Sequence, residues 1–460
     1  MFRFYNTLTK QKEEFQPLKA NEARIYTCGP TVYLFPHIGN WRSYIFSDVL
    51  HRVLKQGGFD VTRVVNITDV GHLVGDGDEG EDKMIVAMRR EGKSAYEVAR
   101  FYEAVFMSDR DKLNVLPATV YPRATEHIAE QIELVKKLEE NGFTYKTTDG
   151  IYFNTLKLPE YGRLSGQRAE EKQAGARVEL GEKKNITDFA LWKFSPADSK
   201  REMEWVSPWG IGFPGWHLEC SAMSKKYLGV PFDIHTGGED HIPVHHENEI
   251  AQTFGADGVL EANVWMHNAY LMADGGKMSK SLGNIYTLAQ LEEKDIEPLA
   301  FRLFCLTAQY RAKLNFTFEA TQATQNALNK LREIIRDWPV PGSEICEDYN
   351  KRFLEAIEDD LNTPQALAVM WEMVGDPTVE NSAKATTLLE FDKIFGLKLE
   401  EYIGKKVEIP AEVDALVSLR QIAREKKDWT ESDRLRDEIA KLGFVVEDAK
   451  DGIKVKKVLN

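Results

Sequence analysis

The hydrophobic and polar positions near the start of the chain predict a strand, a helix and a second strand. Residues 23–26 can form a short buried strand, and apolar residues recur at helical spacing over residues 41–53. This helix is predicted to end at Gly57-Gly58, because glycine suits the left-handed conformation of a helix C-cap. Residues 59–67 are rich in β-branched side chains and predict the second strand. The pattern is one βαβ unit of a doubly wound, Rossmann-like α/β sheet.

A polar loop over residues 27–40 joins the first strand to the helix. Doubly wound sheets bind nucleotides at this position, because the free N–H groups and the dipole of the helix N-terminus attract anions. In this loop His37 can donate a hydrogen bond to a phosphate, and Gly39 leaves room for a nucleotide against the backbone. An ordinary loop with a capping histidine is the alternative.

The pattern further along divides the chain into five segments. Short strands and turn residues predict an insertion that interrupts the α/β domain, and amphipathic spacings predict a helical bundle after that domain. The segments are residues 1–142 (first half of the α/β domain), 143–205 (an inserted α+β segment), 206–295 (second half of the α/β domain), 296–400 (helical throughout) and 401–460 (a small C-terminal domain with one more helical pair).

Composition narrows the class of protein. The hydrophobic fraction of 43% is sufficient for large cores, and no apolar run approaches the roughly 18 residues of a membrane span. The N-terminus lacks the features of a signal peptide, and four scattered cysteines do not form a disulfide framework, so we expect a cytoplasmic protein. The net charge of −14 excludes a generic polyanion binder. Any contact with nucleic acid requires a local basic patch.

A candidate metal site follows a predicted strand near residue 235. His245 and Glu249 are four residues apart, so they share one face of a predicted helix. His246 lies three residues before Glu249 and could replace His245. One or two added thiolates would complete a zinc site of mixed sulfur, nitrogen and oxygen ligands. A helix with a simple His–Glu hydrogen bond is the alternative.

Two later segments carry clustered basic residues. Residues 274–284 form a glycine-flanked loop in which Lys277 and Lys280 could close over phosphates, and an exposed basic loop is the alternative. Near the C-terminus, arginines and lysines surround Trp429, an arrangement that suits stacking on an unpaired base. Trp429 could equally belong to the core.

These stretches together resemble the class I aminoacyl-tRNA synthetases, and within them the cysteinyl-tRNA synthetase family. The segment His37-Ile38-Gly39-Asn40 matches the first family signature, and Lys277-Met278-Ser279-Lys280-Ser281 matches the second. The two occur in the family's order on the expected βαβ contexts. Further matches are residues 174–179, 214–220, 245–249 and 359–364, so the resemblance covers nearly the whole chain.

The resemblance implies a zinc ion with four protein ligands and selects His245 over His246. Zinc prefers thiolate, so the substrate cysteine could bind as a thiolate, whereas the hydroxyl of serine is a much poorer ligand. Selection of cysteine would then need no editing site. The implied ligands are Cys28, Cys220, His245 and Glu249.

The implied activity is ATP-dependent ligation of L-cysteine to the 3′ end of tRNA(Cys) through a cysteinyl-adenylate, with Mg²⁺ accompanying ATP, by a monomeric enzyme. The family's functional residues carry over in four groups. They are His37, Asn40, Lys277 and Lys280 for catalysis, Thr31, Gly39 and Lys280 for ATP, Thr68, Trp216, His235 and Asp240 for the substrate pocket, and Arg424, Trp429, Asp433 and Asp448 for the anticodon.

The chain also departs from the family pattern. The acidic stretch over residues 70–81 is expanded, Phe213 stands where arginine is common, and Glu239 and His241 differ from the usual residues. These departures affect the rim of the pocket. The nearest rival activity is the ligation of cysteine to an aminosugar through the same adenylate, but those enzymes lack a full anticodon-binding end. The other rivals are a non-catalytic regulator that kept the fold and a nucleotidyltransferase with a similar first motif.

Overall fold

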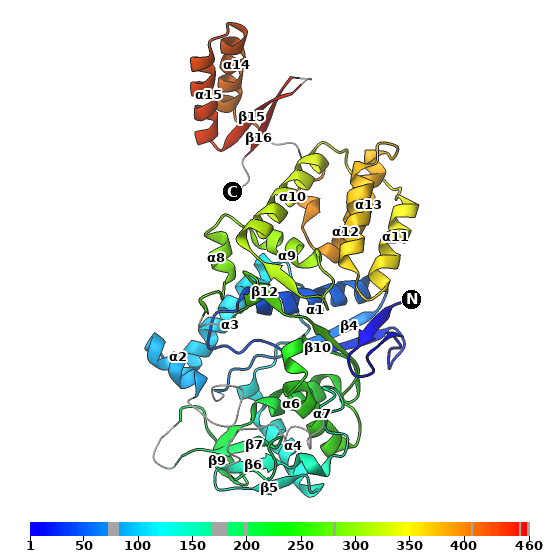
Figure 1. The fold of residues 1–460 in the computed structure, drawn as a ribbon, viewed down its shortest axis with the longest axis vertical. Coiled ribbons are helices and arrows are strands. Elements are labelled where there is room, and N and C mark those ends of the chain that lie inside the picture. Colours follow the sequence, from blue (N-terminus) through cyan, green and yellow to red (C-terminus); the bar gives the residue numbers. More distant parts are fainter. Residues whose placement is uncertain are drawn as a thin grey trace.

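A four-stranded parallel sheet forms the centre of the structure, a computed structural model (Figure 1). Its strand order is β11-β10-β3-β4, and every neighbouring pair is parallel. The strands are β3 (Glu22–Thr27), β4 (Asp60–Val65), β10 (Phe232–Gly238) and β11 (Ala262–Asn268). The predicted βαβ unit is confirmed by β3, α1 (Ile38–Gln56) and β4. The structure describes residues 1–71, 82–167, 182–196, 201–278, 282–405, 408–449 and 452–457.

Helices cover both faces of this sheet. Successive side chains of a strand point to opposite faces, so Ile25 and Ile234 pack in the core on the α1 side. Tyr26, the residue after Ile25, packs in a second core with residues of α6 (Trp216–Leu228) and α7 (His245–Asp257). Figure 1 shows α1 on one side of the sheet and α6 and α7 on the other. A parallel sheet with two buried faces is the arrangement that a doubly wound fold requires.

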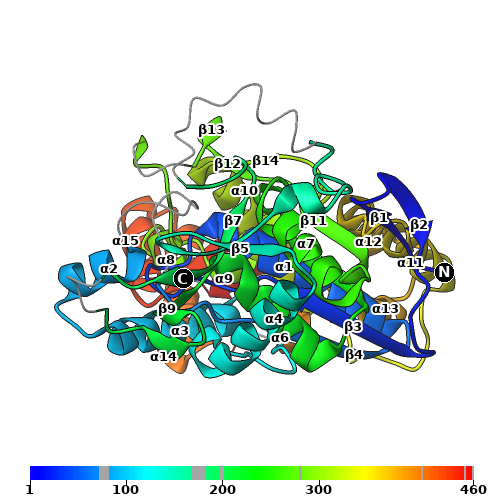
Figure 2. The same cartoon turned by 90° about the horizontal axis from the view of Figure 1, so that it is seen from below.

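Further elements surround this centre. Helix α4 packs against α6 and α7, and the three lie together in the view from below (Figure 2). An N-terminal hairpin lies beside β11, and two helices follow β4 in the chain. These elements are β1 (Arg3–Asn6), β2 (Gln11–Glu14), α2 (Lys83–Glu91), α3 (Ala95–Lys112) and α4 (Ile128–Glu140).

The insertion forms a five-stranded antiparallel sheet of order β5-β6-β7-β9-β8. This sheet continues to Pro214, past residue 205 where the sequence predicts the insertion to end. The reason is a hairpin: β8 and β9 pair with each other, and β9 pairs with β7. The strands are β5 (Thr144–Lys146), β6 (Gly150–Phe153), β7 (Phe189–Phe194), β8 (Trp205–Ser207) and β9 (Gly210–Pro214).

A small sheet separates the α/β domain from the helical bundle. Strand β14 pairs with β12, so residues 296–400 are not helical throughout as the spacing predicts. Three residues are too few to show a strand period against the flanking helices. The strands are β12 (Leu271–Ala273), β13 (Gly276–Lys277) and β14 (Leu314–Phe316), and the helices are α8 (Leu288–Glu292), α9 (Pro298–Leu306), α10 (Phe318–Arg336), α11 (Glu347–Glu358), α12 (Thr363–Gly375) and α13 (Asn381–Phe395).

The C-terminal unit has a core of its own and projects from the bundle at the top of Figure 1. Its helical pair, α14 (Ala411–Glu425) and α15 (Trp429–Lys441), agrees with the sequence pattern. An antiparallel hairpin of β15 (Phe444–Ala449) and β16 (Gly452–Lys457) completes it. None of the described helices is long and apolar enough to cross a membrane.

A buried carboxylate on α1 joins the α/β domain to the helical bundle. Asp48 Oδ2 accepts hydrogen bonds from Arg302 Nη2 of α9 at 2.6 Å and from Arg52 Nε at 2.7 Å. Asp48 Oδ1 accepts from the backbone N of Leu116 at 2.7 Å. Burial alone would raise the pKa of Asp48, but the Arg302 and Arg52 guanidinium groups outweigh it and hold this pKa below its ordinary value.

We expect Asp48→Asn to lower the free energy of unfolding by about 3 kcal/mol at neutral pH, because Arg302 would then be a buried cation without its anion. A carboxyl whose pKa is depressed by folding contributes stability above its unfolded pKa of about 3.9, and the contribution is lost as the pH falls. The difference in the free energy of unfolding between wild type and variant should therefore become smaller at acidic pH. Denaturant unfolding at several pH values measures it.

The matched control is Glu372→Gln, which breaks the exposed Glu372–Arg352 pair of α12 and α11. Exposed pairs contribute little, so this variant should stay within about 0.5 kcal/mol of wild type. Equal effects of the two substitutions would contradict the special role of the buried pair.

Candidate nucleotide and metal site

Backbone contacts hold the loop after β3 against the loop after β4. Gly29 N donates to Asn66 Oδ1 at 2.7 Å, and a Cβ atom on Gly29 would lie 1.6 Å from the Asn66 backbone oxygen. Only glycine fits there. Thr68 N donates to Pro30 O at 3.0 Å, and Thr31 and Thr68 form a parallel bridge. The structure therefore brings Thr31 and Thr68, predicted for ATP and for the substrate pocket, side by side.

His37 is the N-cap of α1, and a capping box with Asn40 sets its orientation. Asn40 N donates to His37 Nδ1 at 3.3 Å, and His37 N donates to Asn40 Oδ1 at 3.1 Å. Burial lowers the pKa of His37, and the opposing effect of Asp240 is smaller, so the ring is neutral at neutral pH. Because Nδ1 accepts, the ring proton resides on Nε2 and can be donated to an anion at the helix N-terminus.

The two signature segments lie against each other although 240 residues separate His37 from Lys277. Ile38 N donates to Tyr286 O at 2.8 Å, and a Cβ atom on Gly39 would lie 2.7 Å from Met278 Cε. Lys277 is exposed, with its Nζ 4.9 Å from the centre of the Tyr270 ring. Lys280, predicted for catalysis and ATP binding, lies outside the described residues.

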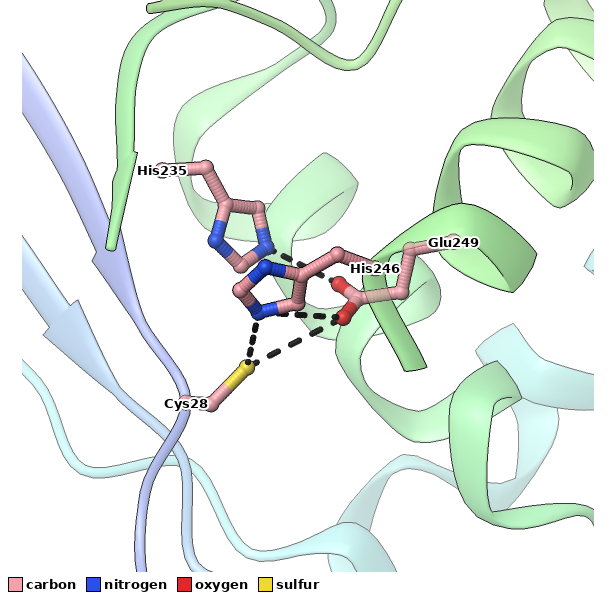
Figure 3. A group of neighbouring side chains, drawn as sticks. All are labelled: Cys28, His235, His246 and Glu249. Carbon is pink, nitrogen blue, oxygen red and sulfur yellow. Dashed lines mark hydrogen bonds and ion pairs between the residues drawn. The ribbon is translucent and has the colours of Figure 1, made fainter. Parts of the chain in front are cut away.

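Cysteine, histidine and glutamate side chains meet beside this loop in a buried cluster (Figure 3). Cys28 follows β3, His235 lies on β10, and His246 and Glu249 come from α7. Cys28 Sγ lies 3.2 Å from His246 Nε2 and 3.8 Å from Glu249 Oε1. His235 Nε2 lies 2.9 Å from Glu249 Oε2. Cys220 of α6 also belongs to the cluster.

Two overlapping sets of four donors could hold a metal ion. One is the predicted set, Cys28, Cys220, His245 and Glu249, and the other is Cys28, His235, His246 and Glu249. In each set the ligand atoms lie within 4.8 Å of one another. The structure thus brings the predicted ligands together, and it adds His235 as a donor to the alternative in which His246 replaces His245.

A second histidine orients each of the two neighbouring histidines of α7. His245 Nδ1 lies 2.8 Å from His217 Nδ1, and His246 Nδ1 lies 2.7 Å from His267 Nε2. The Nε2 atom of each ring then points into the cluster, where His245 Nε2 lies 3.1 Å from Glu249 Oε1. Partners of this kind fix the ring orientation of metal-binding histidines.

The chemistry of these donors fits a divalent cation. Glu249 is completely buried, and among the described residues no lysine or arginine pairs with it. Burial raises the pKa of Glu249 well above its ordinary value and raises that of Cys220 to about 11. Burial also lowers the pKa of His235 to about 4. Without a cation the cluster must therefore keep its thiol and carboxyl protons, and a metal ion would replace them.

The remaining pocket residues differ in exposure. Trp216 is half-buried, with its ring 4.8 Å from that of His245, and Asp240 is exposed. His235 is completely buried, and its Nε2 lies 2.9 Å from Glu249 Oε2. The sequence did not predict a role for Lys83, whose Nζ lies 5.5 Å from the Trp216 ring. Its position directly after the helix cap Asp82 does not indicate that it lies near Trp216.

A buried arginine packs on Phe213, the residue that stands where the family commonly has an arginine. The Arg201 guanidinium lies 3.6 Å from the centre of the Phe213 ring, forms an ion pair with Asp82 and donates to Gly71 O at 3.2 Å. Arg201 therefore ties the insertion to the N-terminus of α2. Phe213 supplies the flat face on which this cation stacks.

Three of the four predicted anticodon residues lie at or near the turn between α14 and α15, and the fourth, Asp448, belongs to β15. Trp429 is 57% exposed and so is not a core residue. The Arg424 guanidinium lies 5.8 Å from its ring. Asp433 is exposed, four residues further along α15, so it shares a helix face with Trp429. The side chain of Asp448 lies outside the described part.

Three protein-family models match the chain. Residues 14–326 match the catalytic domain of class I (C) tRNA synthetases, residues 352–400 match the DALR domain, and residues 406–455 match the cysteinyl-tRNA ligase anticodon-binding domain. The curated cysteine–tRNA ligase 1 of Burkholderia lata is 50% identical, over 97% of this chain and 95% of its own length. The chain belongs to the cysteinyl-tRNA synthetase family. The cysteine–tRNA ligases of Zymomonas mobilis and Caldicellulosiruptor saccharolyticus are 40% and 42% identical, over 97% and 99% of this chain and 96% and 100% of their own lengths.

Solved structures of other class I enzymes have a fold similar to that of this cysteinyl-tRNA synthetase family member. Mycobacterium tuberculosis methionyl-tRNA synthetase bound to methionyl-adenylate superposes with a TM-score of 0.55 at 16% identity, covering 82% of this chain and 90% of that one. Agrobacterium radiobacter leucyl-tRNA synthetase, in a ternary complex, gives a TM-score of 0.58 at 11% identity, with 85% of each chain covered. These likenesses confirm the predicted class I fold.

Proposed function

We propose that this protein joins L-cysteine to the 3′ end of tRNA(Cys) in two steps driven by ATP. The observation that carries the proposal is that both family signatures meet beside a buried cysteine, histidine and glutamate cluster. Four free cysteines suit a reducing, cytoplasmic setting, where translation takes place. We further propose that the enzyme acts as a monomer.

In the first step the cysteine carboxylate would attack the α-phosphorus of ATP, and the bond to the β-phosphate would break with release of pyrophosphate. A carboxylate needs no general base, so the protein contributes positioning and electrostatic stabilisation. His37 would donate through Nε2 to a phosphoryl oxygen at the N-terminus of α1. Gly39 would let the nucleotide approach the backbone, and Lys277 and Lys280 would neutralise the pyrophosphate. Mg²⁺ would enter with ATP.

For the metal we propose Cys28, Cys220, His245 and Glu249 as ligands, because two thiolates favour zinc over harder cations. A bound zinc ion would supply a position that prefers the sulfur of cysteine to the hydroxyl of serine. His217 would hold the ring of His245, and His235 would hold Glu249 through the contact at 2.9 Å. Trp216, Thr68 and Asp240 would complete the substrate pocket.

In the second step a terminal ribose hydroxyl of tRNA would attack the adenylate carbonyl and release AMP. Recognition of tRNA would involve the C-terminal unit, where Trp429 would stack on an anticodon base. Arg424, Asp433 and Asp448 would contact base edges. This unit also distinguishes the proposal from an aminosugar ligase, which would have no use for an anticodon-binding domain.

Cysteine-dependent exchange of pyrophosphate into ATP tests the first step. We expect exchange with cysteine, at most weak exchange with serine, and loss of exchange after chelation with recovery on adding zinc. Charging of tRNA(Cys) by the same preparation then excludes the aminosugar activity. Absence of exchange from zinc-loaded protein would overturn the proposal and favour a regulator that kept the fold.

We expect Cys220→Ser to lower both bound zinc and the affinity for cysteine, because a hydroxyl replaces one of two thiolates. Metal analysis of dialysed protein measures the first effect, and the KM for cysteine in the exchange reaction measures the second.

The control is Cys346→Ser, which changes a buried free cysteine outside the cluster and should leave zinc unchanged. His235→Asn separates the two donor sets, since His235 belongs to only one of them. Intact zinc in Cys220→Ser together with lost zinc in His235→Asn would assign the metal to the alternative set.

We expect Trp429→Ala to lower kcat/KM for charging of tRNA(Cys) about tenfold through loss of base stacking, while exchange stays unchanged. Leu442→Ala, an exposed apolar residue at the far end of α15, is the control and should charge normally. Normal charging by Trp429→Ala would remove this side chain from tRNA recognition.

A further inference from the structure

Two exposed aromatic rings, Phe35 and Phe101, meet beside the first signature, and Tyr96 of α3 is exposed as well. Phe35 precedes His37 by two residues and is 48% exposed, and on α3 Tyr96 is 43% and Phe101 is 40% exposed. The ring centres of Phe35 and Phe101 lie 6.1 Å apart in an edge-to-face arrangement. Exposure of neighbouring large aromatic rings to water is unfavourable, so such a group indicates a binding surface.

Cations accompany these rings. Lys93 Nζ lies 4.6 Å from the centre of the Phe101 ring, and the Arg100 side chain is 57% exposed. An open hollow of about 400 Å³ is lined by Lys93, Tyr96, Glu97 and Arg100. We call Phe35, Lys93, Tyr96, Arg100 and Phe101 together the α3 surface.

The acidic residues beside the α3 surface already have partners. Glu97 accepts from Ser94 N at 2.9 Å and from Ser94 Oγ at 2.7 Å, so it caps the start of α3. Glu91 accepts from Arg90 and from Tyr102. Arg100 forms two ion pairs at 3.9 Å, from Nη1 to Glu103 Oε2 and from Nη2 to Glu126 Oε1. Lys93, in contrast, has no ion pair among the described residues, so its ammonium group over the Phe101 ring is available to a polyanion.

Exposed rings interleaved with cations bind single-stranded nucleic acid, because bases stack on the rings while the cations meet the phosphates. The net charge of −14 repels phosphates from the surface as a whole, so a local patch of this kind is informative. Its position is equally informative. Arg90 Nη2 donates to Tyr33 O at 3.0 Å and ties the end of α2 to the loop that leads to His37.

We propose that the α3 surface binds the unpaired 3′ end of tRNA and guides its terminal ribose to the signature loop. This inference rests on the proposed function, in which that ribose must reach the adenylate beside His37. An unpaired strand suits the surface because its bases expose their faces. The anticodon, in contrast, belongs to the C-terminal unit, on the far side of the helical bundle (Figure 1).

Binding of two RNAs tests the proposal: intact tRNA(Cys), and the same tRNA without its unpaired 3′ nucleotides. We expect Phe101→Ala and Lys93→Glu each to weaken binding of the intact tRNA about tenfold at fixed salt, and to leave binding of the shortened tRNA unchanged. Phe101→Trp should retain binding, since it keeps a stacking face. Cysteine-dependent exchange should be unaffected in every variant.

Lys351→Glu is the matched control, because Lys351 is a lysine of α11, 76% exposed and remote from the signature loop. It makes the same charge change and should bind both RNAs as wild type does. Wild-type binding of intact tRNA by the Phe101 and Lys93 variants would overturn the proposal, and would leave a protein partner as the ligand to seek. Equal losses for both RNAs would overturn it too, in favour of a contact with the paired stem. Failure of the wild-type protein to catalyse exchange would instead count against the proposed function.

Discussion

Complete burial of Glu249 among cysteines and histidines constrains this whole site. A carboxylate in such a place needs a cation or must keep its proton, because charge is poorly solvated in a protein interior. Here the neighbours are other metal-binding groups, whose own charged forms are equally disfavoured by burial. One divalent ion would offset all of these costs together. The second layer of histidines, His217 and His267, holds the rings of His245 and His246 that would face the ion.

Close backbone packing sets the geometry on the other side of this cluster. Gly29 can approach the oxygen of Asn66 only because it has no side chain, and this approach fixes the loop that carries Cys28 and leads to His37. The loop therefore serves two functions at once. Its start supplies the Cys28 thiol to the buried cluster, and its end would present the neutral imidazole of His37 to an anion. Under the proposed function, one short segment would therefore set the distance between the bound amino acid and the nucleotide.

The domains around this site are joined by polar contacts as well as by packing. Asp48 links α1 to α9 through Arg302, so the helix that begins at His37 is anchored in the helical bundle. Arg201 links the insertion to α2 through Asp82, close to Trp216 and Lys83. Breaking such a buried pair is costly, because it leaves a charge in the protein interior with neither a partner nor water to solvate it. They give the walls of the pocket a defined position relative to the signature loop.

The sequence by itself determined the central βαβ unit, the family and the residues of both signatures, because these depend on local periodicity and on short motifs with fixed spacing. It also placed Cys28, Cys220, His245 and Glu249 in one set through the family resemblance. Strand β14, the C-terminal hairpin and the extension of the inserted sheet to Pro214 depended on pairing between distant residues, and three to six residues carry too little local signal to predict them. Only the tertiary structure revealed that His235 can complete a second donor set with His246, that Arg201 stacks on Phe213, and that Phe35 meets Phe101. Each of these joins side chains from separate elements, and the packing of those elements decides which of them meet.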